Sequence, residues 1–213
     1  MLISNESNRA VFKYYINPKP ITYNATAKAT ESLALINSLA PDSYCEEIIR
    51  NSYNFILSEQ NTDGSWFYAD DAKGQWIDNF HTGYVLVALN KIKGLLSLDY
   101  GQQEIDRGLD YHLRNHYTND WLPKYYSNSM YPIDTHCYAQ SIITFSEFGN
   151  AGMAKKLVES AVKNTYNHSQ KYFIYSIRKH YTVKTNLLRW CNAYMFYALA
   201  LYESIANYSG LDF

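Results

Sequence analysis

The chain has 213 residues, of which 19 are basic and 20 acidic, and its net charge is −1. This balance gives no electrostatic reason to expect binding to nucleic acid or to an anionic membrane surface. Aromatic residues make up 16% of the chain and include 22 tyrosines. Because tyrosine combines a flat apolar face with a polar tip, this excess is typical of a groove that holds a sugar, and equally of tyrosines packed between helices.

Cysteine usage and the N-terminal sequence bear on the compartment. Cys45, Cys137 and Cys191 are odd in number and widely spaced, so they do not indicate a disulfide framework, and we expect a reducing environment. The first residues lack the basic and long apolar segments of a signal peptide, and no run approaches the ~18 apolar residues of a membrane helix. The sequence therefore predicts a cytoplasmic protein without membrane insertion.

Residues 1–23 are expected to form an N-terminal arm. Proline disfavours helix in this region, at Pro18 and Pro20. The arm is expected to be extended, or to contain a short helix, and to pack on the body of the protein through its apolar residues, Phe12, Tyr14, Tyr15 and Ile16.

From residue 24 to the end, at 213, apolar residues recur at steps of three and four, which predicts a helical-repeat domain. Seven helices are expected, over residues 24–40, 42–60, 78–97, 102–117, 133–149, 152–167 and 186–207. Between the second and third helices, Asp63-Gly64 is a strong turn signal, because glycine accepts positive φ and aspartate bonds its own backbone. Alternation typical of strands is absent between the helices, so the fold class is predicted to be all-α.

A repeat of about 55 residues relates these helices. His81 and His136 are 55 residues apart, as are Trp66 and Trp121, and one further step from His136 reaches Cys191. The chain therefore consists of helical hairpins, and such hairpins stack into a solenoid or close into a ring. We expect an α/α toroid-like arrangement, as an incomplete ring or arc.

The segment Gln60-x-x-Asp63-Gly64-Ser65-Trp66 resembles the glutamine–tryptophan motif of the prenyltransferase and squalene-cyclase repeat, which builds α/α toroids. Three further segments are similar to bacterial exopolysaccharide and capsule biosynthesis proteins and, remotely, to the C-terminal domain of glucuronyl C5-epimerases. They are Asp78-Asn79-Phe80-His81-Thr82-Gly83-Tyr84, Pro132-Ile133-Asp134-Thr135-His136 and Arg189-Trp190-x-x-Ala193-Tyr194-Met195. The acidic Asp-x-Asp-Asp segment of terpene cyclases is missing from the sequence.

If the inner helices begin at one rim, that rim brings together candidate catalytic residues. These are His81, His136, Asp78 and Asp134, since imidazole and carboxyl groups exchange protons near neutral pH. Arg189 is expected to bind a uronate carboxylate. The other candidate substrate-binding residues are Trp190, Asn192, Trp66, Tyr68, Trp76, Trp121 and Tyr131. The alternative is structural: the aspartates cap helices, the histidines bond loop carbonyls and the tryptophans pack between helices.

Two other chemistries remain open. Cys137, Cys191 and His81 could bind zinc, as in the zinc-dependent toroids, but the chain has no close CxxC or HxxxH pair, so no metal site or other cofactor is predicted. Paired carboxylates would indicate a glycosidase, and their separation would decide its stereochemistry. The sequence has neither a glycine-rich phosphate loop nor a Gly-x-Ser-x-Gly elbow.

The sequence thus predicts a protein of bacterial surface polysaccharide biosynthesis that binds or modifies a uronic-acid or hexose saccharide. If it is an enzyme, an epimerase, lyase or glycosidase-like activity is expected. The alternatives are a non-catalytic helical-repeat interaction module of the same pathway and a zinc- or diphosphate-dependent transferase or cyclase. A homodimer is also expected, because an unpaired seventh helix leaves an apolar flank to be covered by the arm or by a second subunit.

Overall fold

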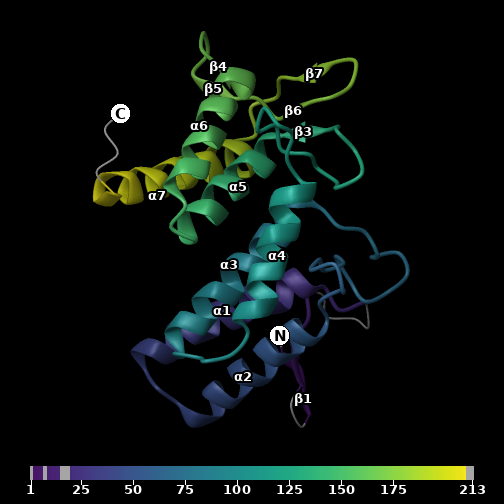
Figure 1. Ribbon diagram of the computed structural model, residues 1–213, viewed down its shortest axis with the longest axis vertical. Coiled ribbons are helices and arrows are strands. Elements are labelled where there is room, and N and C mark those ends of the chain that lie inside the picture. The colour runs from purple at the N-terminus through teal and green to yellow at the C-terminus, as the bar shows by residue number, and fades with distance from the viewer. Residues whose placement is uncertain (1, 7–8, 15–19, 210–213) are drawn as a thin grey trace. The chain divides into compact units, whose positions relative to one another are not determined.

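Helices make up most of the computed structural model, which describes residues 2–6, 9–14 and 20–209 (Figure 1). The seven α-helices in these ranges are α1 (Tyr23–Leu39), α2 (Ser43–Ser58), α3 (Asn79–Leu95), α4 (Gln102–Asn115), α5 (Thr135–Glu147), α6 (Ala151–Thr165) and α7 (Ala193–Ser209). A π-helical segment, η1 (Leu188–Asn192), leads directly into α7. The prediction of seven helices in a mainly helical fold is confirmed.

The helix starts follow the expected repeat and its capping chemistry. Helices α1, α3 and α5 begin at residues 23, 79 and 135, two steps of 56 residues. Asp42 caps α2, and its carboxylate accepts a hydrogen bond from the Cys45 amide at 2.8 Å. Asn150 caps α6 in the same way, through the Met153 amide at 3.1 Å.

Short antiparallel strands join the helices, which the sequence did not predict. Strands β1 (Leu2–Glu6) and β2 (Arg9–Phe12) form one pair, and β4 (Tyr166–Asn167) and β5 (Tyr172–Phe173) form another. A three-stranded sheet has the order β3 (Ile133–Asp134), β6 (Ser176–Ile177) and β7 (Thr182–Val183). The last five strands have two residues each, too few for an alternating pattern to be visible in the sequence.

The chain forms two compact units, and each is described by itself. The first contains Met1–Ile77 and Tyr84–Leu113, and the second contains Asp78–Gly83 and Arg114–Phe213. The division into an arm, residues 1–23, and a repeat domain, residues 24–213, stays a prediction. None of the helices in the described ranges is long and apolar enough to cross a membrane.

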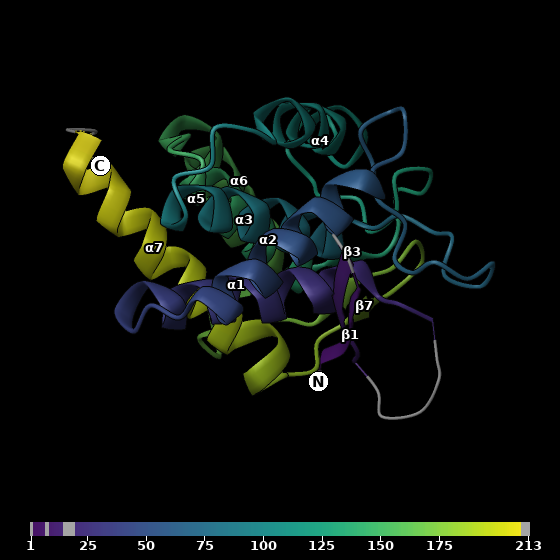
Figure 2. The ribbon, with the colours of Figure 1, turned by 90° about the horizontal axis from the view of Figure 1, so that it is seen from below.

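In the first unit, α1 and α2 lie side by side and the β1–β2 hairpin packs on them (Figure 2). The Ser52 hydroxyl of α2 donates to the Ala10 carbonyl at 2.9 Å, and the Thr26 hydroxyl of α1 donates to the Phe12 carbonyl at 3.1 Å. The arm therefore packs on the helices as expected, although as a hairpin. The expectations for Tyr15, Ile16 and Pro18 lie outside the described residues.

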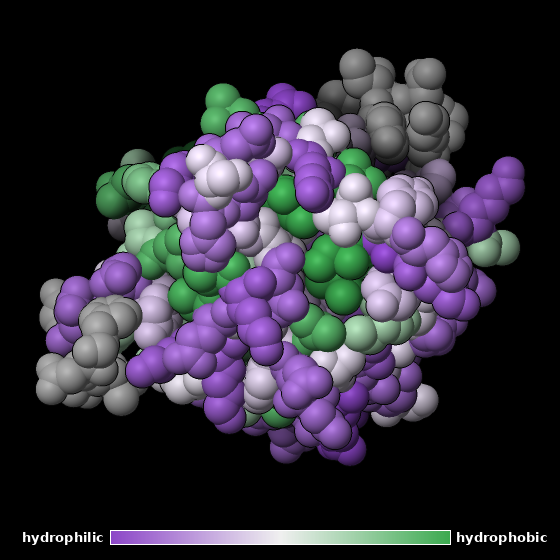
Figure 3. Space-filling model, turned by 90° about the horizontal axis from the view of Figure 1, so that it is seen from above, coloured by the Kyte–Doolittle hydropathy of each residue, from purple (hydrophilic) through white to green (hydrophobic). Residues whose placement is uncertain are grey.

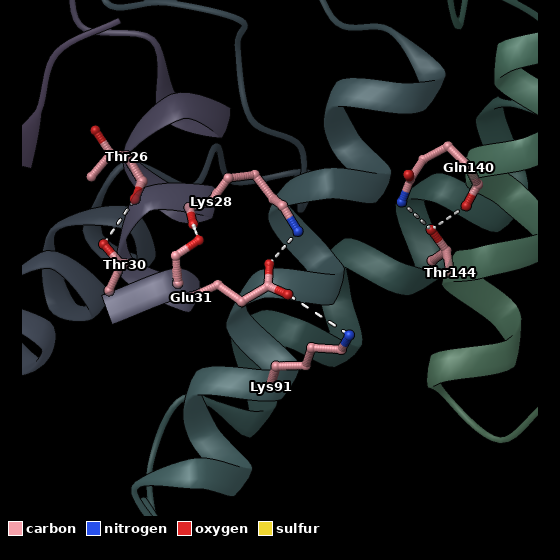
Figure 4. A network of polar contacts seen from close by, with 8 residues as sticks. Thr26, Lys28, Thr30, Glu31, Lys91, Gln140 and Thr144 are labelled. Carbon is pink, nitrogen blue, oxygen red and sulfur yellow. Dashed lines mark hydrogen bonds and ion pairs between the residues drawn. The ribbon is translucent and has the colours of Figure 1, made fainter. Parts of the chain in front are cut away.

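Ion pairs link two helices of this unit. The Glu31 carboxylate of α1 contacts Lys28 on the same helix and also Lys91 of α3, at 3.7 Å (Figure 4). Both lysines are partly exposed, so each pair adds ~1 kcal/mol at most to stability. Burial of the apolar helix faces must supply most of the packing energy.

The segment that resembles the glutamine–tryptophan motif connects α2 to α4 within the first unit. The Gln60 side-chain amide donates to the carbonyls of Gly64 at 2.9 Å and Glu104 at 2.8 Å, and accepts from the Arg107 guanidinium at 2.8 Å. The Trp66 indole is 2% exposed and donates to the Ile56 carbonyl at 2.8 Å. These residues therefore hold the helical hairpins together, which makes the motif architectural.

In the second unit, α5 packs against α6 and α7 (Figure 1). All twelve of its residues from Thr135 to Ser146 are buried. Polar groups among them bond locally: the Thr144 hydroxyl donates to the Gln140 carbonyl at 2.8 Å and accepts from the Gln140 amide at 3.3 Å (Figure 4). Helix α5 is thus the central helix of this unit, and the residues at its start are positioned by packing on every side.

Candidate functional site

Four of the residues proposed from the sequence meet around one aromatic ring in the second unit. The Phe80 ring centre lies 4.1 Å from that of His81 and 5.0 Å from that of His136. It also lies edge-on to Trp190, at 5.8 Å. Asp78, which is bonded to His81, completes this group at the start of α3.

The Asp78 carboxylate positions His81. One oxygen, Oδ1, accepts from the His81 amide at 2.8 Å and so caps α3, while Oδ2 lies 2.6 Å from His81 Nδ1. The side chain of Asp78 is 0% exposed and that of His81 is 20% exposed. Because Nδ1 donates to the carboxylate, Nε2 is the ring position at which His81 takes up or releases a proton. The expected capping role of Asp78 and its proposed catalytic role are therefore compatible.

His136 has a structural environment. It is fully buried, its Nδ1 donates to the Trp190 carbonyl at 3.0 Å, and its ring stacks on the Trp190 indole with centres 4.1 Å apart. Burial lowers its pKa to about 4, so it is neutral at physiological pH. The sequence placed this histidine at an open rim as a catalytic residue. The structure instead matches the structural alternative, since α5 is enclosed by its neighbours.

Asp134 is a buried carboxyl at the other helix start. It is 2% exposed and caps α5 by accepting from the His136 amide at 2.8 Å. Burial raises its pKa to about 6, although the positive charge of Arg178 acts in the opposite direction. Asp134 therefore carries a proton at far higher pH than an exposed aspartate does, as a general acid requires.

Both carboxyl groups belong to the same site. The charges of Asp78 and Asp134 both raise the pKa of the Tyr125 phenol, after the larger effect of burial, and the same holds for the Cys137 thiol. The Phe80 ring packs edge-on against Tyr125 at 5.5 Å. A carboxylate with a bound imidazole and a second, partly protonated carboxyl therefore lie near one aromatic wall.

The π-helical segment η1 supplies a surface next to this wall. Trp190 is 39% exposed, and Arg189 is exposed, so both are accessible to a ligand. Asn192, in contrast, holds a loop: its amide accepts from Phe173 N at 2.8 Å and donates to Phe173 O at 3.2 Å. Its predicted role in substrate binding is thus replaced by a structural one, whereas π-helical segments such as η1 are frequent at functional sites.

The other predicted stacking residues are distributed over both units. Trp66 is buried in the first unit and offers no face to a ligand. Tyr68 and Trp76, also in the first unit, stack on each other with ring centres 4.3 Å apart. In the second unit, Tyr131 is 36% exposed. The single cleft expected from the sequence therefore reduces, within the second unit, to the residues around His81 and Trp190.

Trp121 lines a separate hollow of the second unit. Its backbone has a positive φ of 59°, and the Lys156 ammonium lies 5.1 Å from the centre of its ring. The hollow has a volume of about 410 Å³, and Asp120, Glu159 and Asn164 also line it. Its size is within the range of small-ligand pockets.

The zinc ligands considered from the sequence do not assemble. Cys137 and Cys191 are both 0% exposed, and burial raises the pKa of each thiol. Among the described residues, no group of three or more histidine, cysteine, aspartate or glutamate side chains is arranged to hold a metal ion.

Arg178, Ser176 and Phe80 are the site residues that the sequence did not single out. Arg178 and Ser176 lie on a two-residue strand and its turn, which have no periodic signal. Phe80 stands within the Asp78–Tyr84 segment, but nothing local indicates that its ring contacts both histidines.

No family model matches the sequence, and no curated protein matches it. Solved structures match by fold. An unsaturated glucuronyl hydrolase specific for heparin aligns over 94% of this chain and 63% of its own, with a TM-score of 0.72 and 10% identity. The GH76 α-mannanase of Bacteroides thetaiotaomicron aligns over 97% and 59%, with a TM-score of 0.68 and 10% identity. A polysaccharide lyase aligns over 93% and 66%, with a TM-score of 0.64 and 12% identity.

These matches establish the fold, because at such low identity they carry nothing more specific. The chain has a partial α/α-toroid fold, shared with carbohydrate-active toroid enzymes. It spans about three fifths of the length of the structures it matches, between 59 and 66% in the three cases above. The toroid predicted from the repeat is therefore confirmed.

Proposed function

We propose that the second unit binds a saccharide at the surface around His81 and Trp190, and that His81 exchanges a proton with it. The observation that carries this proposal is the Asp78–His81 pair, in which an enclosed carboxylate holds a partly exposed imidazole at 2.6 Å. An imidazole fixed in this way has a defined tautomer and orientation, as a general base requires. The adjacent Trp190 face, 39% exposed, suits stacking on a sugar ring.

The reaction class that best fits is proton abstraction next to a uronate carboxylate. Nε2 of His81 takes the proton from C5, and the electron pair of the C–H bond passes into the carboxylate, which forms an enolate. A proton returned to C5 from the opposite face gives the epimer. Elimination of the oxygen at C4, with a proton supplied to it, gives an unsaturated uronate instead. Asp134, whose pKa is raised to about 6, is the proposed proton donor in both cases.

The polysaccharide role is supported by fold and by sequence resemblance. Proteins with this fold are named as acting on saccharides: a glucuronyl hydrolase, a mannanase and a polysaccharide lyase. The segments around Asp78, Asp134 and Arg189 resemble bacterial surface polysaccharide biosynthesis proteins, and we propose a role in that pathway.

Three assays on uronate polysaccharides test the proposal and separate its forms. Deuterium uptake at C5 in heavy water reports epimerisation, ultraviolet absorbance of a C4–C5 double bond reports elimination, and new reducing ends report hydrolysis. His81→Gln is expected to lower any such activity by about 10²-fold or more, and Asp78→Asn to lower it too, because it releases the tautomer. His168→Gln, a change at an exposed histidine of the same unit, is the matched control. Full activity of His81→Gln would overturn the proposal.

A non-catalytic interaction module is the second candidate, favoured by apolar side chains on the surface. Leu188, Phe196 and Tyr197, on η1 and α7, are 75%, 77% and 48% exposed. Figure 3 shows hydrophobic side chains among hydrophilic ones on one face of the molecule. Exposed apolar residues in this number are typical of contact surfaces. If the module reading holds, Phe196→Ser abolishes partner binding while His81→Gln leaves it unchanged.

A further inference from the structure

We infer that Arg178, on the sheet β3–β6–β7, is the residue that binds the carboxylate of an acidic saccharide, and that it sets the specificity of the site. The inference deepens the proposed function and rests on it. The sequence assigned this role to Arg189, which the structure places on η1, exposed to solvent.

The sheet places three polar side chains on one face. Asp134 of β3 lies directly opposite Ser176 of β6, and directly opposed residues of paired strands project to the same side. Arg178 follows two residues after Ser176 and so continues that side. The charge of Arg178 acts on both Asp134 and Tyr175, which confirms that they are close.

Two polar groups on this face lack a partner among the described residues. They are the Nε–H of Arg178, a buried atom of a partly buried side chain, and the hydroxyl of Ser176, a residue that is 0% exposed. A buried polar group without a hydrogen bond destabilises a protein, so native structures provide an acceptor or donor for most of them. This face therefore has unused hydrogen-bonding capacity beside a guanidinium charge.

The Arg178 backbone is already fixed, which favours it over Arg189. Its amide donates to the Tyr181 carbonyl at 2.8 Å and closes the turn between β6 and β7. Ordering a long exposed side chain costs entropy on binding, whereas a side chain that is partly buried before binding loses less. A planar guanidinium also matches a planar carboxylate through two parallel hydrogen bonds.

The charges around Arg178 favour a carboxylate over a more highly charged group. Asp134 on the same face would repel a phosphate dianion, whereas a single carboxylate can share a proton with it, as paired carboxyl groups do. Lys179 and His180 are exposed on the turn beyond Arg178. Their basic character attracts a chain of acidic sugars without selecting one of them. The chemistry that this face recognises is thus a uronate within an acidic polysaccharide.

The test compares binding of uronate oligosaccharides with binding of the same oligosaccharides after reduction of their carboxyl groups, measured by titration calorimetry. The probes are fragments of hyaluronan, heparosan and alginate. Wild-type protein is expected to prefer the acidic forms, and Arg178→Gln to lower their affinity tenfold or more while leaving the reduced forms within about twofold. Arg178→Lys is expected to restore part of the preference, because it keeps the charge and loses the paired geometry.

The matched control is Lys184→Gln, which removes one positive charge from an exposed residue just after β7. It is expected to weaken binding of acidic fragments by less than about threefold. Melting curves establish that each variant is folded. The inference is overturned if Arg178→Gln weakens acidic and reduced fragments equally, or if Arg189→Gln alone removes the preference. Wild-type protein that binds none of the fragments would overturn the proposed function as well.

Discussion

Asp134→Asn is expected to make the protein more stable at neutral pH, because the native carboxyl is buried without full compensation. Burial raises the pKa of Asp134 from 3.8 to about 6, so the folded state holds its proton more tightly than the unfolded chain. The stabilisation of the protonated form is complete below about pH 4 and is lost as pH rises through 6. Each factor of ten corresponds to about 1.4 kcal/mol, so the loss at pH 8 is about 3 kcal/mol.

Asparagine does not ionise, but its side-chain oxygen still caps α5 by accepting from the His136 amide. The variant should therefore gain up to about 3 kcal/mol in free energy of unfolding at pH 8, and the difference should vanish near pH 4. Urea unfolding followed by circular dichroism at several pH values measures the difference. Hydrogen exchange of the α5 amides reports the second unit separately.

Asp42→Asn is the matched control, since Asp42 also caps a helix but is exposed. Hydrogen bonds from the Cys45 amide and side chain lower the pKa of Asp42, so its ionised form stabilises the fold. Its stabilisation is present above the ordinary pKa and lost on acidification, so this variant should be the less stable one at neutral pH. A difference between Asp134→Asn and wild type that is independent of pH, or that favours wild type at pH 8, would refute the reasoning.

Two further predictions concern packing and assembly. Gly64→Ala should destabilise the first unit by more than 2 kcal/mol, because an added Cβ would lie 2.5 Å from the Arg107 carbonyl oxygen at a φ of +94°. Gly149→Ala should cost only about 1 kcal/mol, since φ there is +69° with nothing within 4 Å; equal losses in urea unfolding would contradict this. The homodimer expected from the sequence would use the exposed apolar face of α7, and Phe196→Ser should then give a monomer by light scattering, whereas a monomeric wild type would remove the idea.

The local elements of this fold were predictable because they depend on short stretches of sequence. The spacing of apolar residues gave all seven helices to within a few residues, and the repeat of about 55 residues agrees with the steps of 56 between helix starts. Asp78 and Asp134 cap helices as expected, because an aspartate before an apolar helical stretch can satisfy the first free amides. The Asp63-Gly64 turn likewise follows from two residues, and Gly64 has a φ of +94°.

The candidate site was predicted in composition but not in the state of its members. His81 and His136 occupy equivalent positions in the repeat, yet one is partly exposed on a carboxylate and the other is enclosed by Trp190 and Phe80. The difference depends on which segments pack over each helix start. No periodicity within a single helix contains that information.

What the sequence by itself determined is therefore the helical repeat, its caps and the residue types at the helix starts. Only the tertiary structure decided which of those residues face solvent and what their protonation is. Asn192 became a loop anchor, and the Asp134 carboxyl acquired a pKa of about 6. Arg178 came to lie on the face of Asp134 through a strand pairing of two residues. The reason is that burial and charge proximity arise from residues distant in the chain, whereas helix formation arises from neighbours.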